Sequence, residues 1–96
     1  MIIKIHKAHG SKIVALCDEY LIGREIEDKN IYLNLSSSFY KGEKKSEDVI
    51  KKHLESARII NAVGKESVGL CVMLRKASEK DVIYIGKIPH VQVLLF

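Results

Sequence analysis

The 96-residue sequence is 47% hydrophobic and carries sixteen Lys and Arg against twelve Asp and Glu, a net charge of +4. This length supports one domain over residues 1–96, and its hydrophobic content excludes a disordered chain. The longest apolar run, the seven residues VGLCVML, is too short for a transmembrane helix, and the start has no signal-peptide pattern. Because the sequence has only two cysteines and no signal-peptide pattern, we expect a cytoplasmic protein with free thiols. Because its apolar runs are short, we expect that it binds no membrane.

The first predicted element is a β-hairpin formed by IIKIHK and KIVALC around the turn AHGS. With His9 and Gly10 at the central turn positions, Lys7 faces Lys12 and Ile2 faces Cys17. One hairpin face then carries Ile3, Ile5, Val14 and Leu16, and the other carries Ile2, Lys4, His6, Ile13, Ala15 and Cys17. This separation into an apolar face and a mixed face supports the register.

A third strand is predicted at residues 31–35, followed at 36–45 by a loop rich in Ser, Gly and Lys. Ser46 is suited to cap a helix, because acidic residues occupy the first turn after it. Apolar residues at helical spacing predict that this helix continues to residue 60 or 61 and ends before Gly64.

Residues 65–77 are predicted to form a second helix, although the apolar run at 68–74 also fits a buried strand. Glu66 in the first turn and Arg75 and Lys76 in the last turn favour the helix. Because the segment is apolar on nearly every side, we expect it to be the more buried helix, packed on the apolar face of the hairpin.

Two strands, DVIYIG and HVQVLLF, are predicted to close the chain on either side of Pro89. Together the elements predict an α+β fold. Its form is a two-layer sandwich: a largely antiparallel sheet of about five strands, with two helices on one face.

Several stretches occur together in one order: KIHKAHGSKIVALCDEYLIG, LSSSFYKGEKKSEDVI, INAVGKESV and VIYIGKIPHVQV. They carry Cys17-Asp18-Glu19, Gly23, Phe39-Tyr40, Gly42, Gly64 and Pro89-His90. This pattern spans essentially the whole chain and resembles the small archaeal proteins grouped as "domain of unknown function 424". The resemblance implies an archaeal cytoplasmic protein with a compact α/β fold and supports the helix at 65–77. It implies no established activity and no catalytic residues.

Cys17, Asp18, Glu19 and His90 are the candidate residues for a small hydrolase or transferase. A reactive thiolate needs a basic partner, but His6 lies four residues along the strand from the position opposite Cys17, roughly 13 Å away. The position of His90 relative to Cys17 is open. The two adjacent acids would raise the thiol pKa, and they point to opposite faces of an extended chain, which disfavours a shared metal. We therefore expect a buried Cys17 without a nearby histidine, and no metal or cofactor.

The segment FYKGEKKSEDVIKK places two aromatic residues beside five lysines and three acids. Aromatic and basic side chains on a glycine-containing loop suit stacking on an unpaired RNA base, with the cations on the backbone. A further phosphate contact is predicted at Lys65, beside free N–H groups at the start of its helix. The alternative is that Phe39 is a core residue and the lysines are a solvated face. The candidate RNA-binding residues are Tyr40, Lys41, Lys44, Lys45, Lys51, Lys52 and Lys65.

The favoured hypothesis is a non-enzymatic module that binds RNA or a ribonucleoprotein, connected with translation on grounds of size, charge and kingdom. The first alternative is the small enzyme described above. The second is a protein–protein adaptor using residues 18–30, where five acids stand against two basic residues. An acidic segment and a basic segment in one small chain can orient a charged partner.

Overall fold

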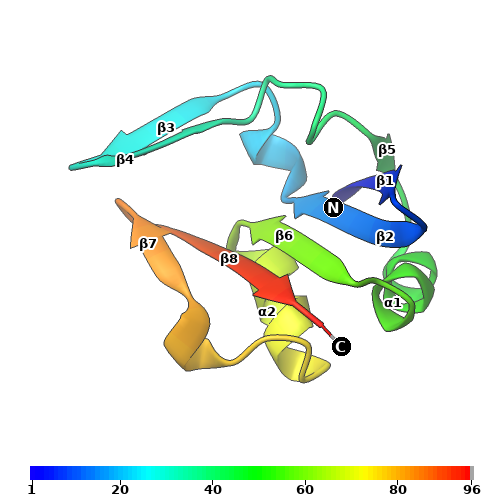
Figure 1. Cartoon of the computed structure of the whole chain (residues 1–96). Helices are drawn as coiled ribbons and strands as arrows, with labels where there is room; N and C mark the ends of the chain where they lie inside the picture. Colours follow the sequence, from blue (N-terminus) through cyan, green and yellow to red (C-terminus); the bar gives the residue numbers. More distant parts are fainter. Residues whose placement is uncertain (96) are drawn as a thin grey trace.

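The computed structural model describes residues 1–95, in which a six-stranded sheet carries both helices on one face (Figure 1). The strand order is β5-β1-β2-β6-β8-β7, and a separate two-stranded sheet pairs β3 with β4. The main strands are β1 (Ile2–Ala8), β2 (Ser11–Cys17), β5 (Glu43–Lys44), β6 (Ile59–Val63), β7 (Ile83–Ile85) and β8 (Ile88–Leu94). The other elements are β3 (Glu25–Asp28), β4 (Ile31–Asn34), α1 (Glu47–Glu55) and α2 (Lys65–Met73). The predicted α+β class is confirmed, with six strands in the main sheet rather than five.

The predicted register of the first hairpin is confirmed, because Lys7 pairs with Lys12 and Ile2 pairs with Cys17. His9 and Gly10 both have positive φ, at 53° and 78°, which is the turn geometry that matches the twist of two antiparallel strands. The turn therefore determines which hairpin residues face the helices.

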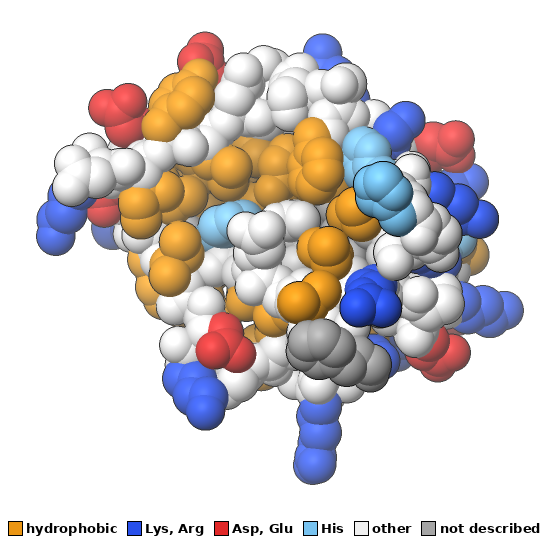
Figure 2. All heavy atoms as spheres, viewed as in Figure 1, with side chains coloured by type: hydrophobic (Ala, Val, Ile, Leu, Met, Phe, Trp, Pro, Cys, Tyr) orange, Lys and Arg blue, Asp and Glu red, His pale blue; other side chains and the backbone are white. Residues whose placement is uncertain are grey.

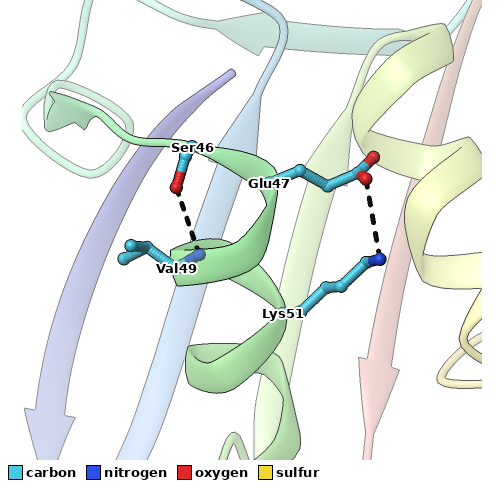
Figure 3. Close-up of polar contacts among 4 residues, drawn as sticks. All are labelled: Ser46, Glu47, Val49 and Lys51. Carbon is cyan, nitrogen blue, oxygen red and sulfur yellow. Dashed lines mark hydrogen bonds and ion pairs between the residues drawn. The ribbon is translucent and has the colours of Figure 1, made fainter.

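The predicted extension of the first helix to residue 60 or 61 is wrong. Helix α1 begins after Ser46, whose hydroxyl accepts a hydrogen bond from the N–H of Val49 at 3.4 Å, and it ends at Glu55 (Figure 3). The run IINAV that follows is β6, a central strand that pairs in parallel with β2 and antiparallel with β8. Its β-branched residues suit a strand buried on both faces, and this preference outweighs the helical spacing of Ile60.

Helix α2 confirms the helical prediction for residues 65–77 over the strand, although it ends at Met73. Val68, Leu70 and Cys71 are buried in one cluster with Ile3, Val14 and Leu16 from the predicted apolar face. Other members of this cluster come from α1, β6 and β8. Both helices therefore cover the apolar face of the sheet, as expected.

A second hydrophobic cluster lies on the opposite face of the sheet. It joins Ala15, Cys17 and Val63 to Leu21, Leu35 and Tyr40, which belong to the long connection between β2 and β5. Partly buried residues of the β3–β4 hairpin pack against it, and Figure 2 shows hydrophobic side chains gathered between this hairpin and the sheet. The predicted strand at 31–35 thus corresponds to β4, outside the main sheet, and its partner β3 was not predicted.

Candidate functional site

The Asp18 carboxylate lies against the start of α2 and is only 1% exposed. Its Oδ1 accepts hydrogen bonds from the N–H and the hydroxyl of Ser67, both at 2.8 Å, and its Oδ2 accepts one from the N–H of Glu66 at 3.1 Å. The first N–H groups of a helix have no partners within the helix, and a carboxylate there also opposes the positive end of the helix dipole. Asp18 therefore caps α2 from a neighbouring segment.

Gly64 provides the space for this cap. It is the residue before α2 and has a φ of +106°, so it has no side chain with which to cap the helix itself. A Cβ atom at this position would lie 2.2 Å from the Asp18 Cγ. Gly64 and Asp18 therefore form one structural unit at the turn from β6 to α2.

Cys17 is fully buried, as expected, and its Sγ lies 3.4 Å from the carbonyl oxygen of Asp18. Burial, with a smaller contribution from the charge of Asp18, raises the pKa of the Cys17 thiol to about 12. A thiol with so high a pKa is a poor nucleophile at neutral pH.

His90 does not complete a catalytic dyad with Cys17. His90 pairs with Val63, which in turn pairs with Cys17, so a whole strand separates the two side chains, at about 10 Å. Burial lowers the pKa of His90 despite the hydrogen bond to the Ala62 carbonyl oxygen, which lies 3.0 Å from Nδ1. Glu19 is exposed and pairs with Lys44. The four candidate catalytic residues are therefore not assembled around one pocket. Residues 1–95 also contain no group of three metal-ligating side chains.

Tyr40 is 4% exposed, so its predicted role as a stacking platform for a base is wrong. Burial raises its pKa well above the ordinary value. Phe39 stacks on the His6 ring with the centroids 4.6 Å apart and meets the Tyr40 ring edge-on at 5.0 Å. The two aromatic residues anchor the 36–45 loop to the sheet, as the alternative interpretation held for Phe39.

The predicted lysines lie at the surface, three of them in ion pairs. Lys44 pairs with Glu19 at 3.1 Å, Lys45 with Glu43 at 2.9 Å, and Lys51 with Glu47 at 3.6 Å (the last drawn in Figure 3). Lys41 and Lys52 are exposed. Exposed ion pairs contribute little free energy, so a phosphate can compete for these lysines.

Lys65 is exposed at the first residue of α2 and its phosphate contact stays a prediction, but the N–H groups predicted to assist it are not free. The N–H groups of Glu66 and Ser67 already donate to the Asp18 carboxylate. The turn before Lys65 also follows a strand rather than a helix.

The acids of residues 18–30 differ in exposure and in their partners. Asp18 is the buried cap of α2, and Glu25 accepts a hydrogen bond from the Tyr32 hydroxyl. Asp28 accepts one from the N–H of Gly86 at 3.1 Å, which ties the β3–β4 hairpin to the β7–β8 turn. Several of these acids therefore have structural partners, and the adaptor alternative stays a prediction.

A basic hollow of about 590 Å³ lies where the first hairpin meets the end of α1. None of its described lining side chains is acidic: they are Ile5, Lys7, Ser11, Lys12, His53, Ser56 and Arg58. In Figure 2 several basic side chains gather at the right-hand end of the molecule, where Figure 1 shows β2 and α1. This hollow is the site in the fold best suited to an anion.

Lys12 is the central residue of the basic hollow. Its Nζ lies 2.8 Å from His53 Nδ1 and 2.9 Å from Ser56 Oγ. Partial burial and the charge of Lys7 lower the Lys12 pKa. Partial burial and the charges of Lys12 and Lys45 lower the His53 pKa, which favours a neutral imidazole that accepts from Lys12 at Nδ1. These groups repel additional positive charge, and a bound anion would relieve that repulsion.

Comparison with known proteins identifies the family. The family model described as "Protein of unknown function (DUF424)" matches residues 6–96. The chain belongs to this family. A crystal structure of an uncharacterized conserved protein from Methanopyrus kandleri is similar, with a TM-score of 0.79 and 29% identity over 99% of this chain and 92% of that one. No curated protein matches, and no helix within residues 1–95 has the length and apolar character needed to cross a membrane.

One feature of the basic hollow, the pairing of Lys7 with Lys12, could be read from the sequence. The predicted hairpin register already placed Lys7 opposite Lys12, and like charges directly across two strands are destabilising. His53 and Arg58 could not be added, because their positions depend on where α1 ends and β6 begins. The pairing of Lys7 with Lys12 was therefore predicted, but the basic hollow was not.

Proposed function

We propose that this DUF424 protein is a non-enzymatic RNA-binding module and that the basic hollow holds phosphates of the RNA backbone. One observation carries the proposal: Lys7 and Lys12 face each other at a hollow whose described lining contains no acid. A fold that keeps two like charges opposite each other loses stability, and a bound phosphate would offset that loss. The predicted connections with ribonucleoprotein and translation remain predictions.

The basic surface extends beyond a single phosphate. A second hollow of about 320 Å³ shares Ile5 and His53 with the first and adds Lys4, Lys45 and Glu43, the acid with which Lys45 forms an ion pair. Lys45 belongs to the 36–45 loop from which RNA binding was first predicted, and Lys41 is exposed nearby in sequence. Two adjoining hollows that both carry lysines suit a polymer of phosphates better than one small anion, provided that a phosphate displaces Glu43 from Lys45.

A paired-lysine experiment tests this site. Lys7→Gln/Lys12→Gln removes two charges from the basic hollow, whereas the control Lys80→Gln/Lys87→Gln removes two from exposed positions near β7. Affinity for a single-stranded RNA is measured by fluorescence anisotropy over a range of salt concentrations. Because each lost phosphate contact lowers the slope of log K against log salt by about 0.7, the first variant should lower it by about 1.4. The control should leave the slope unchanged.

Two outcomes would refute the proposal. One is equal slopes for the two double variants, because the basic hollow would then be no different from any other charged surface. The other is a wild-type protein that does not bind RNA at low salt. Circular dichroism of both variants shows whether the fold survives, since Lys12 also contacts α1.

The proposal also predicts that the affinity for RNA depends on pH through the protonation of His53. Its pKa lies below the ordinary value of 6.5 in the free protein, and a neighbouring phosphate would raise it. A group with a higher pKa in the complex takes up protons on binding, so RNA affinity should rise as the pH falls through the pKa in the complex. His53→Gln should remove this dependence while the salt dependence remains.

A further inference from the structure

The outer face of α2 carries the charged Lys65 and Glu66 at its start and an exposed apolar part around Gly69 and Met73. Gly69 and Met73 follow Lys65 at intervals of four residues, so the three form one ridge on the helix surface. Met73 is 60% exposed, and the helix is apolar on its inner side as well. The apolar part of this exposed face is therefore available for contact with another surface.

A hollow of about 620 Å³ lies beside this ridge, between α2 and the segment that leads into β7 and β8. Tyr84 borders it and is 61% exposed. Lys65 lies at one end of the hollow, at the start of α2, whereas Glu79 lies near Val72 in the second half of the helix. Within residues 1–95 neither Lys65 nor Glu79 forms an ion pair.

Neither packing nor backbone conformation within the described chain requires a glycine at position 69. A Cβ atom built on it meets nothing within 4 Å, and its φ is not in the left-handed region. Glycine in a helix interior is less stable than alanine, so an unforced glycine there weakens α2. With no side chain at this open position, another backbone could approach α2 closely at Gly69.

We propose that this face, formed by the ridge of Lys65, Gly69 and Met73 with Tyr84 and Glu79, binds the same face of a second copy in a two-fold symmetric dimer. The face is self-complementary in shape, because Met73 and Tyr84 project and the hollow beside Gly69 can receive them. In a two-fold contact each such pair of residues occurs twice.

The charges at the two ends of the hollow also match this arrangement. When two α2 helices cross antiparallel at Gly69, Lys65 of each copy approaches Glu79 of the partner subunit. Two complementary ion pairs then flank an apolar centre, which is the usual arrangement of a protein interface. The contact does not involve the basic hollow, so dimerisation does not rest on the proposed RNA binding.

The glycine gives the sharpest test. Gly69→Ala should raise the melting temperature of the monomer, because alanine is the better helix former and the position is open. The same change should weaken the dimer, because the added methyl groups meet at the closest approach of the two helices. The dimer dissociation constant is measured by analytical ultracentrifugation, and we expect it to rise about tenfold, or 1.4 kcal/mol.

Charge reversal tests the orientation. Lys65→Glu and Glu79→Lys should each weaken the dimer, and the double variant should regain most of the loss, because it restores both ion pairs. Lys80→Glu is the matched control, since Lys80 is exposed next to Glu79 but does not line the hollow.

Gly69→Cys supplies an independent measurement. The native thiols Cys17 and Cys71 are buried, so mild oxidation should form a disulfide dimer through position 69. A wild-type protein that stays monomeric at millimolar concentration would overturn the proposal. A dimer whose dissociation constant is unchanged by Gly69→Ala and by both charge reversals would do the same.

Discussion

Replacing Asp18 by alanine should destabilise the protein far more than replacing its neighbour Glu19. The change removes the acceptor of three hydrogen bonds and leaves the N–H groups of Glu66 and Ser67 without that partner at the start of α2. Hydrogen bonds to a charged group contribute about 1.5–3 kcal/mol each, but three bonds to one carboxylate are not additive. We therefore expect a loss of about 3 kcal/mol, above the roughly 1 kcal/mol typical of an ordinary N-cap.

Thermal and urea unfolding measure this loss. For a domain of this size, about 3 kcal/mol corresponds to a fall of roughly 15 °C in melting temperature. Glu19→Ala is the control, because Glu19 is exposed and makes only a surface ion pair with Lys44; it should change the stability by less than about 0.5 kcal/mol. An Asp18→Ala variant within about 1 kcal/mol of the wild type would refute the assignment of Asp18 as the cap of α2.

Two further predictions concern Gly64 and the two cysteines. Gly64→Ala should lower the free energy of unfolding by at least about 1–3 kcal/mol, because Gly64 has a positive φ and a Cβ would overlap Asp18. The loss should be smaller in the Asp18→Ala background, and a double-mutant cycle measures the difference. Burial holds the pKa of Cys17 at about 12 and that of Cys71 at about 11, above the ordinary value of 9.0, so both thiols should react with Ellman's reagent only as fast as the protein unfolds. Because the thiol pKa values are raised in the folded state, the neutral thiols contribute to stability below pH 9, and this contribution is lost as the pH rises toward 11 and 12. Rapid labelling of either thiol in the native protein at pH 8 would contradict its burial.

The sequence predicts elements well where local chemistry determines them. The first hairpin was predicted to the residue, because a two-residue turn with His9 and Gly10 allows one register in which the apolar side chains share a face. The Ser46 cap was likewise predicted from its own neighbours. Both features depend on residues within a few positions of each other.

Features that depend on distant partners were not predictable in this way. The run at 59–63 fits both a helix and a buried strand, and only its place between β2 and β8 decides for the strand. Tyr40 lies in a lysine-rich loop and reads as a surface residue, yet it packs against the face of the sheet that the hairpin register left mixed. The basic hollow was not predicted for the same reason: only its Lys7–Lys12 pair is local, whereas His53 and Arg58 come from distant segments.

Asp18, which follows β2, has its structural role at the start of α2. Helix α2 is only weakly amphipathic, so the pattern of its apolar residues does little to determine its rotation about its own axis. The Asp18 carboxylate binds two successive N–H groups and the Ser67 hydroxyl, and it thereby fixes that rotation. Because Ser67 is held inward, Gly69 and Met73 are turned outward. A buried acid at the end of a strand, which by residue type alone suggests a catalytic group, therefore selects the side of α2 that is presented for dimerisation.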